Sequence, residues 1–259
     1  ILIGSDPLRI DDLWSKIYVG TAMTGRRGAG VNAISAIDMA LWDIKGKYEN
    51  KPVFELMGGK KQDEIIPYAS LQPIGHSFQE YKDSLVEWAT KAKDLGFRAV
   101  KSEVTLNGPY AHSGLNEHDD KATEVVAAVR KALGPDIKLM IDVQYRWLNA
   151  DEALPVVKDW KEFDIYFLET PVWTDDIKSY ARMHDEAPMK IAAGEWLSTR
   201  YEFEDLIING KIDVAQPDVG RCGGLTEAMK IAKFSQEHKR IIVPHCWKTS
   251  VSISATAHF

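Results

Sequence analysis

The chain has 259 residues, of which 45% are hydrophobic and 27% charged, a balance typical of a folded globular protein with one large α/β barrel or two modest domains. A formal net charge of -6 argues against a nucleic-acid partner. The two cysteines make no disulfide framework, and no apolar run reaches the roughly 20 residues of a membrane span, so we expect a cytoplasmic protein.

The first part of the chain is predicted to be helical. Residues 32–48 place Ile34, Ile37, Leu41 and Ile44 at helical spacing, and residues 51–59 predict a short helix that stops at the pair Gly58 and Gly59. Before them, the glycine-rich and basic segment 20–30, GTAMTGRRGAG, is expected to be a loop.

From about residue 65, short apolar strands alternate with amphipathic helices. The predicted strands are 65–71, 98–104, 137–144, 165–171, 190–196, 213–220 and 240–247, and the clearest helices are 78–96, 119–134 and 225–239. Strands separated by one helix pair in parallel, so the repeat predicts a closed TIM-type (β/α) barrel. An open doubly wound sheet is the alternative, although no G-x-G-x-x-G motif follows an early strand.

One domain boundary is expected near residue 62, between a helical segment (1–62) and the barrel domain (63–259). The chain starts at Ile1 without a methionine and stops at Phe259 within SVSISATAHF, which is typical of the start of a helix. We therefore expect an internal piece of a longer protein, with the eighth barrel strand beyond Phe259.

Acidic residues stand at the ends of three consecutive predicted strands, where barrel active sites lie. Asp142, Glu169 and Glu195 are the last acids of these strands. Three carboxylates at close range repel one another unless a cation lies between them, and ligands that are all oxygen favour Mg²⁺, with Mn²⁺ as the alternative. The competing interpretation is that each acid pairs with a lysine in a loop.

Two further pairs extend this predicted site. The strand 98–104 carries Lys101-Ser102-Glu103, and strand alternation places Lys101 and Glu103 on one face, as it does Asp142 and Gln144. If that face is inward, Ser102 points to the helices. Asp218 and His245 end neighbouring strands, where a carboxylate would orient the imidazole as a general acid or base. A structural histidine is the alternative.

Several blocks resemble one family. SAIDMALWDIKGK and PVFELMGG are similar to the helical end of the N-terminal capping domain in mandelate racemase-like enzymes of the enolase superfamily. MIDVQ, FLETP and AAGEW resemble the three metal-ligand strands of this family, and QPDVGRCGG and PHCWKTS resemble its Asp–His strands. The resemblance implies that 1–62 is the C-terminal helical part of an α+β capping domain, and that the protein is a homo-oligomer.

The resemblance also implies a reaction. Mg²⁺ and Lys101 would stabilise the enediolate that forms when His245 removes the proton α to the carboxylate of a sugar acid. Racemases of the family resemble K-x-K at the second strand, but here Glu103 stands at the second lysine. This favours loss of water by a dehydratase over a two-base racemase or epimerase, and it leaves a cycloisomerase, or Glu103 itself as the base, open.

Other residues carry weaker expectations. Arg26 and Arg27 could hold a distal anionic group of the substrate. His112, Gln144 and Trp247 are candidate substrate contacts, with Trp196 and Lys248 beside the pocket, and Cys222 is expected to be a small buried residue rather than a nucleophile. Two rival functions remain: a Schiff-base barrel enzyme that uses Lys101 or Lys248, and a non-catalytic homologue.

Overall fold

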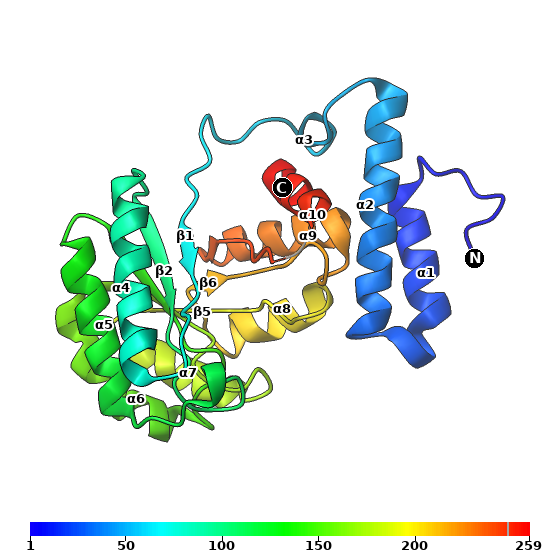
Figure 1. Ribbon diagram of the computed structural model, residues 1–259. Helices are drawn as coiled ribbons and strands as arrows, with labels where there is room; N and C mark the ends of the chain where they lie inside the picture. Colours follow the sequence, from blue (N-terminus) through cyan, green and yellow to red (C-terminus); the bar gives the residue numbers. More distant parts are fainter. Residues whose placement is uncertain (248) are drawn as a thin grey trace. The chain divides into compact units, whose positions relative to one another are not determined.

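The computed structural model describes residues 1–247 and 249–259, with Ser113 described by its backbone alone. The helices are α1 (Ile10–Gly25), α2 (Ala29–Glu49), α3 (Val53–Leu56), α4 (Phe78–Asp94), α5 (Asp119–Leu133), α6 (Ala150–Asp159), α7 (Ile177–Glu186), α8 (Thr199–Ile208), α9 (Gly224–Glu237) and α10 (Ser250–His258). The strands are β1 (Ala69–Leu71), β2 (Ala99–Glu103), β3 (Lys138–Asp142), β4 (Ile165–Glu169), β5 (Lys190–Ala193), β6 (Val214–Ala215) and β7 (Ile241–Ile242) (Figure 1).

The described strands follow one another in the sheet in chain order. β1 to β5 pair in parallel, as the alternation of strands and helices predicts. A doubly wound sheet reverses its strand order at a switch point, so the consecutive order shows that the open doubly wound alternative is wrong.

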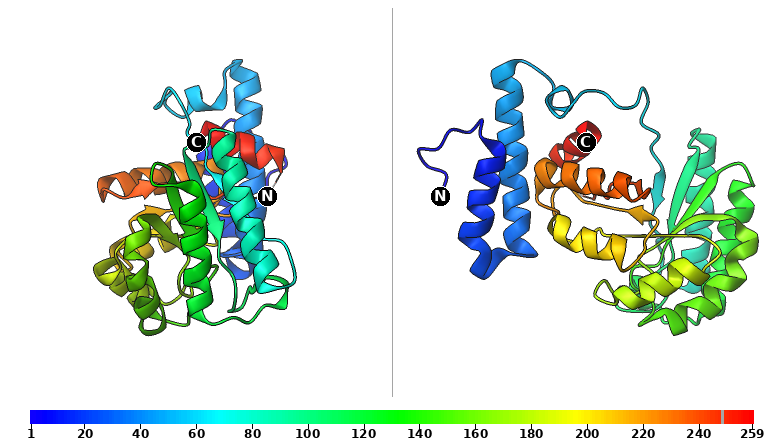
Figure 2. Two further views of the ribbon diagram at one scale, coloured as in Figure 1. Left: turned by 60° about the vertical axis from the view of Figure 1, so that its left-hand side comes forward. Right: turned by 180° about the vertical axis from the view of Figure 1, so that it is seen from behind.

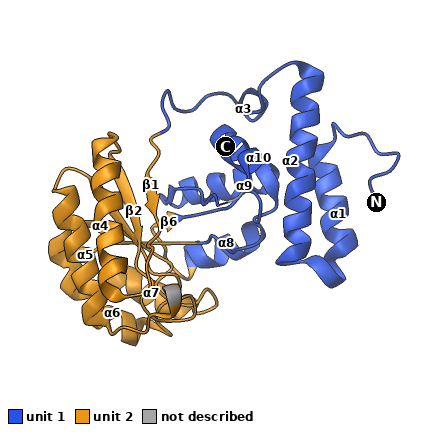
Figure 3. Ribbon diagram, in the orientation of Figure 1, with its two compact units in different colours: residues 1–65, 194–208, 215–259 blue, residues 66–193, 209–214 orange. Residues whose placement is uncertain are grey.

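The chain divides into two compact units (Figure 3). Unit 1 contains residues 1–65, 194–208 and 215–259, and unit 2 contains residues 66–193 and 209–214. This division follows the packing of the chain rather than its order, because the N-terminal helices and the C-terminal segments share unit 1. The expected boundary near residue 62 stays a prediction.

Unit 2 is built around strands that are buried on both faces. Val100, Leu139, Ile141, Leu168 and Ile191 are fully buried, which is why these strands read as continuous apolar runs in the sequence. The helix α4 begins with a capping box, in which the Ser77 hydroxyl accepts from the Glu80 backbone N–H and the Glu80 carboxylate accepts in return. The apolar runs end in polar residues, and these form part of the candidate site.

Unit 1 contains the helices α1 and α2, which lie side by side (Figures 1 and 2). The prediction of a loop over residues 20–30 is wrong for most of its length, because α1 continues to Gly25 and α2 begins at Ala29. A Cβ atom on Gly30 would lie 2.2 Å from the Gly25 Cα. The two glycines therefore allow close backbone packing where the helices meet, and only residues 26–28 connect them.

The apolar face of α2 is shorter than its pattern indicates. Ile34 and Leu41 are buried, but Ile44 is 43% exposed. Leu41 packs against Ile10, the first residue of α1, so α2 extends past the end of its partner helix before it reaches Ile44. The spacing marks the face correctly, whereas the length of the partner helix decides how much of that face is covered.

Each predicted strand is longer than the strand observed. The largest difference is in the last two strands, which are two residues each. β5 ends at Ala193 because Gly194 has φ +122 and starts a turn in which the Leu197 N–H donates to the Gly194 carbonyl. Glu195, Asp218 and His245 therefore lie in loops that follow their strands.

None of the helices in the described residues is long and apolar enough to cross a membrane.

Candidate active site

A buried ammonium lies beside two carboxylates in unit 2. Lys101 is on β2, Asp142 ends β3, and Glu169 is the direct partner of Asp142 on β4. The Lys101 Nζ lies 2.6 Å from the Glu169 Oε1 and 3.8 Å from the Asp142 Oδ2. All three side chains are less than a tenth exposed, so these charged groups meet in a site with little water.

Electrostatics keep Lys101 charged. Burial by itself would lower the pKa of its ammonium, but the attraction of Glu169, Tyr68 and Asp142 outweighs burial and holds the pKa well above its ordinary value. The Nζ also lies 5.5 Å from the centre of the Tyr68 ring. Lys101 is therefore a fixed cation, and it lacks the lowered pKa that activates a Schiff-base lysine.

Asp142 is held by neighbours that follow the strands. Its Oδ1 accepts hydrogen bonds from the Thr170 hydroxyl and the Gln144 backbone N–H, both at 3.0 Å. Gln144 has φ +44 and lies beyond the end of β3. The prediction that Gln144 shares a strand face with Asp142 is therefore wrong, because the alternation of side chains ends with the strand.

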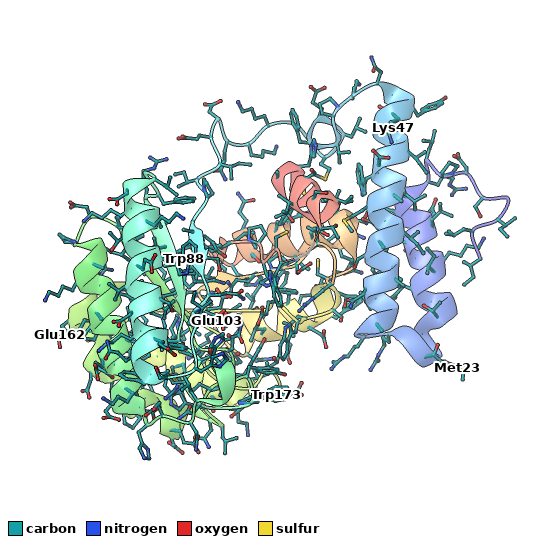
Figure 4. The ribbon with its side chains drawn as sticks, in the orientation of Figure 1. Met23, Lys47, Trp88, Glu103, Glu162 and Trp173 are labelled. Atoms are coloured by element: carbon teal, nitrogen blue, oxygen red, sulfur yellow. The ribbon has the colours of Figure 1, made fainter. Side chains whose placement is uncertain are left out.

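Glu103 ends β2 and is partly buried (Figure 4). Its Oε1 accepts from the Thr105 hydroxyl at 3.2 Å, and its Oε2 accepts from the Gln72 amide at 3.3 Å. Burial raises the pKa of the Glu103 carboxyl, and these two hydrogen bonds oppose the rise. Within the described residues, its hydrogen-bond partners are thus neutral side chains rather than a lysine or arginine.

Unit 1 contains the second group of predicted residues. The His245 Nδ1 lies 2.8 Å from the Asp218 Oδ2, and its Nε2 lies 3.1 Å from the Glu195 Oε2. All three residues are buried. A carboxylate only accepts hydrogen bonds, so Asp218 places a proton on Nδ1 and directs Nε2 toward Glu195.

The loop that carries Asp218 is itself closely hydrogen-bonded. The Asp218 Oδ1 accepts from the Gly220 N–H at 2.7 Å, and its carbonyl accepts from the N–H groups of Arg221 and Cys222 at 2.8 Å. Cys222 is fully buried, and burial raises the pKa of its thiol, which fits the expectation of a buried rather than nucleophilic cysteine.

The weaker candidates are placed elsewhere. The Arg27 Nε lies 2.7 Å from the Glu202 Oε1, so an intramolecular carboxylate holds this arginine, while Arg26 is exposed. The rings of His112 and Tyr81 lie edge to face, with their centres 5.8 Å apart, and Trp247 is 70% exposed. Lys248 lies outside the described residues. Substrate binding by any of these residues stays a prediction.

Tyr68 and Thr170 are parts of the unit 2 cluster that the sequence analysis missed. Thr170 follows Glu169 directly in LETP, so a hydroxyl next to a predicted ligand was the available signal. Tyr68 precedes the observed strand β1 by one residue, and only the fold shows that its ring lies near Lys101.

The predicted metal ligands belong to different compact units: Asp142 and Glu169 are in unit 2, and Glu195 is in unit 1. Among the described residues, no group of three or more His, Cys, Asp or Glu side chains is arranged to hold a metal ion. The donor chemistry nevertheless fits a hard cation, since the side chains of Asp142, Glu169 and Glu195 offer carboxylate oxygens. The three-ligand site stays a prediction.

Comparison with known proteins places this geometry in a family. Residues 84–259 match the family described as enolase C-terminal domain-like, and residues 1–58 match the mandelate racemase / muconate lactonizing enzyme N-terminal domain. A D-galactarolactone cycloisomerase of Agrobacterium fabrum is 34% identical over 258 residues, which is 100% of this chain and 65% of the relative. A D-galactonate dehydratase of Cronobacter sakazakii is 33% identical over 261 residues, with 99% and 65% covered.

A solved structure agrees with these matches. The crystal structure of the 3,6-anhydro-D-galactonate cycloisomerase from Zobellia galactanivorans is similar with a TM-score of 0.88 and 37% identity, over 99% of this chain and 68% of that one. The chain spans about two thirds (65%) of the length of the curated relatives that it matches. With both family matches and this α/β fold, the chain belongs to the enolase superfamily, in its mandelate racemase and muconate lactonizing enzyme branch.

Proposed function

We propose that the protein is a metal-dependent lyase that removes the proton α to the carboxylate of a sugar acid and then eliminates water. The observation that carries this proposal is the buried contact between the His245 Nδ1 and the Asp218 Oδ2 at 2.8 Å. This contact orients the imidazole and makes Nε2, which lies 3.1 Å from the Glu195 Oε2, the ring nitrogen proposed for proton transfer. The names of the similar proteins, a dehydratase and two cycloisomerases, support a reaction of this kind.

Asp142, Glu169 and Glu195 are the residues proposed to hold the metal, with Mg²⁺ favoured and Mn²⁺ as the alternative. When bound, the cation supplies positive charge where negative charge develops on the substrate carboxylate. Enolase superfamily enzymes generally use a divalent metal, and the donor set of this chain is all oxygen. Lys101 is placed to add a permanent positive charge beside Asp142 and Glu169.

The residues of the chain then divide the proton transfer. His245 Nε2 takes the α-proton as the α C–H bond breaks, and Asp218 stabilises the imidazolium that results. The carbon–oxygen bond at the β-carbon breaks next, and the leaving hydroxide takes the proton from His245 and departs as water. The enol product rearranges to a 2-oxo-3-deoxy acid. A single histidine serves both steps, so no second base is needed.

Glu103 argues against a two-base racemase. A second lysine would be a cationic base on the opposite face of the substrate, whereas Glu103 is a partly buried carboxyl with a raised pKa. In its protonated form it donates a hydrogen bond, and in its charged form it repels the substrate carboxylate. Neither form of Glu103 provides the amine base that a second lysine would supply.

A cycloisomerase is the second candidate, because two of the similar proteins carry that name. The first step would be the same, but the β-leaving group would stay attached to the molecule, so the product would keep the mass of the substrate. A racemase and a non-catalytic homologue are weaker alternatives, since the former lacks its second base and the latter does not explain the buried Asp218–His245 contact.

Several properties of the whole protein belong to the same proposal. These are a TIM-type barrel that is incomplete within this chain, a division into capping (1–62) and barrel (63–259) domains, a cytoplasmic location and a homo-oligomeric state. The consecutive sheet order supports the barrel, and the family matches at 1–58 and 84–259 support the two domains.

The test is a screen of the full-length protein with Mg²⁺ against acid sugars and their lactones, followed by NMR in deuterated water and by mass spectrometry. We expect a product that has lost water and carries solvent deuterium at C3. A product of unchanged mass identifies a cycloisomerase, and equilibration of both α-configurations identifies a racemase. Absence of turnover together with absence of α-proton exchange would reject the proposal.

A further inference from the structure

The N-terminus of α9 is bound by side chains from distant helices. This helix has Gly223 at its N-cap and no side-chain cap of its own. Instead, the Ser35 hydroxyl on α2 accepts from the Gly223 N–H at 2.9 Å, and the Asp38 Oδ2 accepts from the Thr226 N–H at 3.0 Å. A helix begins with unpaired N–H groups, and here α2 supplies the acceptors.

Two further side chains complete these contacts. The Trp14 Nε1 on α1 donates to the Gly223 carbonyl at 2.7 Å, and the Trp42 Nε1 on α2 donates to the Thr226 hydroxyl at 2.9 Å. Both peptide groups of Gly223 are thereby fixed from outside its own segment. We call Trp14, Ser35, Asp38 and Trp42 the α9 clamp.

The glycine pair 223–224 is needed for this approach. Gly223 has φ +110 and Gly224 has φ +85, conformations that L-residues with side chains rarely adopt. A Cβ atom on Gly224 would lie 2.3 Å from the Asp38 Oδ2. The motif containing Asp38 and the motif CGGL at 222–225 therefore form one contact, although neither belongs to the proposed reaction chemistry.

Asp38 is an unusual residue for a purely structural contact. It is 1% exposed, and in the described residues its Oδ1 has no hydrogen-bond partner. Burial raises the pKa of Asp38 to about 6, against hydrogen bonds from Thr226 and Leu225 that lower it. Asp11 is a nearby negative charge that also raises it. A buried carboxylate is rare unless it is paired, so the contacts of Asp38 with the start of α9 are a specific feature of this fold.

The clamp lies a few residues from Asp218. The turn that follows Asp218 is closed by the Arg221 and Cys222 N–H groups, and Gly223, the next residue, is already held by Ser35 and Trp14. The Cys222 carbonyl also accepts from the Thr199 N–H at 3.0 Å. The segment 218–226 thus has hydrogen bonds along its length, and the Asp218 carboxylate at its start contacts His245.

We propose that Asp38, with Ser35 and Trp14, is a set of positioning residues that fixes the 218–226 segment and thereby the Asp218–His245 hydrogen bond. The catalytic consequence rests on the proposed function, whereas the geometric consequence does not. Asp38 touches neither substrate nor the reacting atoms. It acts through the start of α9, and its loss lets Asp218 move away from the His245 Nδ1.

The geometric consequence is measured without substrate, by NMR of ¹⁵N-histidine-labelled full-length protein. The His245 Nδ1–H in a hydrogen bond to a carboxylate gives a downfield proton signal, which His245→Gln assigns by its disappearance. In Asp38→Ala we expect this signal to broaden and to exchange faster with solvent. In Asp38→Asn, which keeps one acceptor oxygen for Thr226, we expect partial or full recovery of the signal.

The catalytic consequence is measured on the same variants with the substrate found in the screen. We expect kcat of Asp38→Ala to fall about ten- to a hundredfold with little change in KM, because displacement of a catalytic group by about 1 Å has effects of this size. Leu41→Ala is the matched control, since Leu41 is a buried α2 residue that packs against Ile10 and Leu13 of α1 and its side chain forms no hydrogen bonds with the 218–226 segment. It should lower the melting temperature and leave both the His245 signal and kcat intact.

Single hydrogen-bond variants cover the case in which Asp38→Ala does not fold. Ser35→Ala and Trp14→Phe each remove one contact to Gly223 and keep most of the packing. An unchanged His245 signal in the folded variants overturns the proposal, as does a kcat loss that Leu41→Ala reproduces in full. A full-length protein without turnover rejects the proposed function alone, because the NMR result still decides whether Asp38 positions the Asp218–His245 pair.

Discussion

The chemical role of Lys101 depends on the charged groups that surround it. A lysine at the end of a barrel strand is compatible with Schiff-base chemistry and with a fixed cation. Two carboxylates on the next two strands of the sheet hold its pKa above the ordinary value, although burial acts in the opposite direction. A Schiff-base lysine needs the reverse shift, so the electrostatics favour a cation that stabilises developing negative charge.

Replacement of the proposed metal ligands should weaken metal binding. We expect Asp142→Asn, Glu169→Gln and Glu195→Gln each to reduce affinity for Mg²⁺ and Mn²⁺ by at least about tenfold, because even outer-shell changes have that effect. Isothermal titration of the apo protein measures the affinity. Asp43→Asn is the control, since Asp43 forms an exposed ion pair with Lys47 on α2. If all three variants bind the metal with the affinity of the parent protein, the proposed metal site is wrong.

His245→Asn should abolish exchange of the substrate α-proton with deuterated solvent. Removal of a positioned general base lowers the rate by about 10²–10⁴. The metal should bind His245→Asn at least as well as the parent, because the imidazole is not one of the proposed ligands. Glu103→Gln is the companion variant, and retained exchange there would show that Glu103 is not the base. Normal exchange in His245→Asn would refute its role.

Asp38 also predicts a pH dependence of stability. Its pKa is about 6 in the folded protein and 3.8 in its ordinary state, so the folded form binds the proton more tightly. The contribution of this group to the free energy of unfolding is therefore largest below about pH 4. It falls as the pH rises to about 6, by about 3 kcal/mol in total.

Chemical denaturation of the parent and Asp38→Asn between pH 4 and 7 isolates this contribution. Other groups titrate in both proteins, so the difference between the two curves reports Asp38. We expect the parent to lose stability relative to the variant as the pH rises. A constant difference across this range would mean that the carboxyl titrates alike in the folded and unfolded chains.

At the scale of elements, the crossing of α1 and α2 depends on glycine for space rather than for flexibility. Met23, near the end of α1, is fully exposed (Figure 4). Gly25, two residues further on, is the residue that lies against Gly30. A composition of glycine and arginine indicates a loop when read locally. The same glycine-rich composition also occurs where two helices pack closely through glycines that face each other, as Gly25 and Gly30 do here.

Gly30→Ala should therefore destabilise the protein. The added methyl group would overlap the backbone of Gly25, and overpacking of this kind costs about 1–3 kcal/mol. Gly20→Ala provides a control of opposite sign, because a Cβ atom on the exposed Gly20 would meet only the end of the exposed Ile1 side chain, at 3.2 Å. Alanine favours helix over glycine by up to about 1 kcal/mol. Urea denaturation measures both. Equal stability of Gly30→Ala and the parent would contradict the close packing.

At the scale of the whole molecule, the N-terminal helices share a compact unit with segments 194–208 and 215–259. Arg27 pairs with Glu202, and the Gly28 N–H donates to the Ser198 hydroxyl at 3.1 Å. Residues before position 30 are thus tied to the segment that follows Glu195. Arg27, which is also predicted to contact the substrate, thus has an ion pair within unit 1, and substrate binding by it stays a prediction.

The outcome of the reaction is a prediction about the whole protein. With Glu103 in place of a second lysine, we expect chemistry on one face of the substrate and loss of water. Product analysis with a substrate of defined α-configuration should show no recovery of the other configuration. Interconversion of the two without loss of water would establish a second base and overturn the dehydratase proposal.

Local sequence was sufficient for much of this protein. The helices over 78–94, 119–133 and 224–237 follow from apolar spacing and capping residues, and the alternation of strand and helix requires parallel pairing. The pair Asp218–His245 could be anticipated, because consecutive parallel strands bring their carboxyl ends to one edge. These features depend on residues that are close in the sequence or on the next strand. The spacing of apolar and polar residues along the chain therefore predicts them.

Tertiary structure alone decided the rest. Asp38 and Thr226 are 188 positions apart, and nothing in either segment indicates that a carboxylate on α2 binds the start of α9. The same holds for Arg27 with Glu202 and for the neutral partners of Glu103. Strand ends also depended on the fold, since Gln144 and Gly194 leave the strand through backbone angles that apolar runs do not reveal. The partners of these polar groups are determined by interactions between residues that are far apart in the sequence. The local spacing of apolar residues contains no information about such interactions.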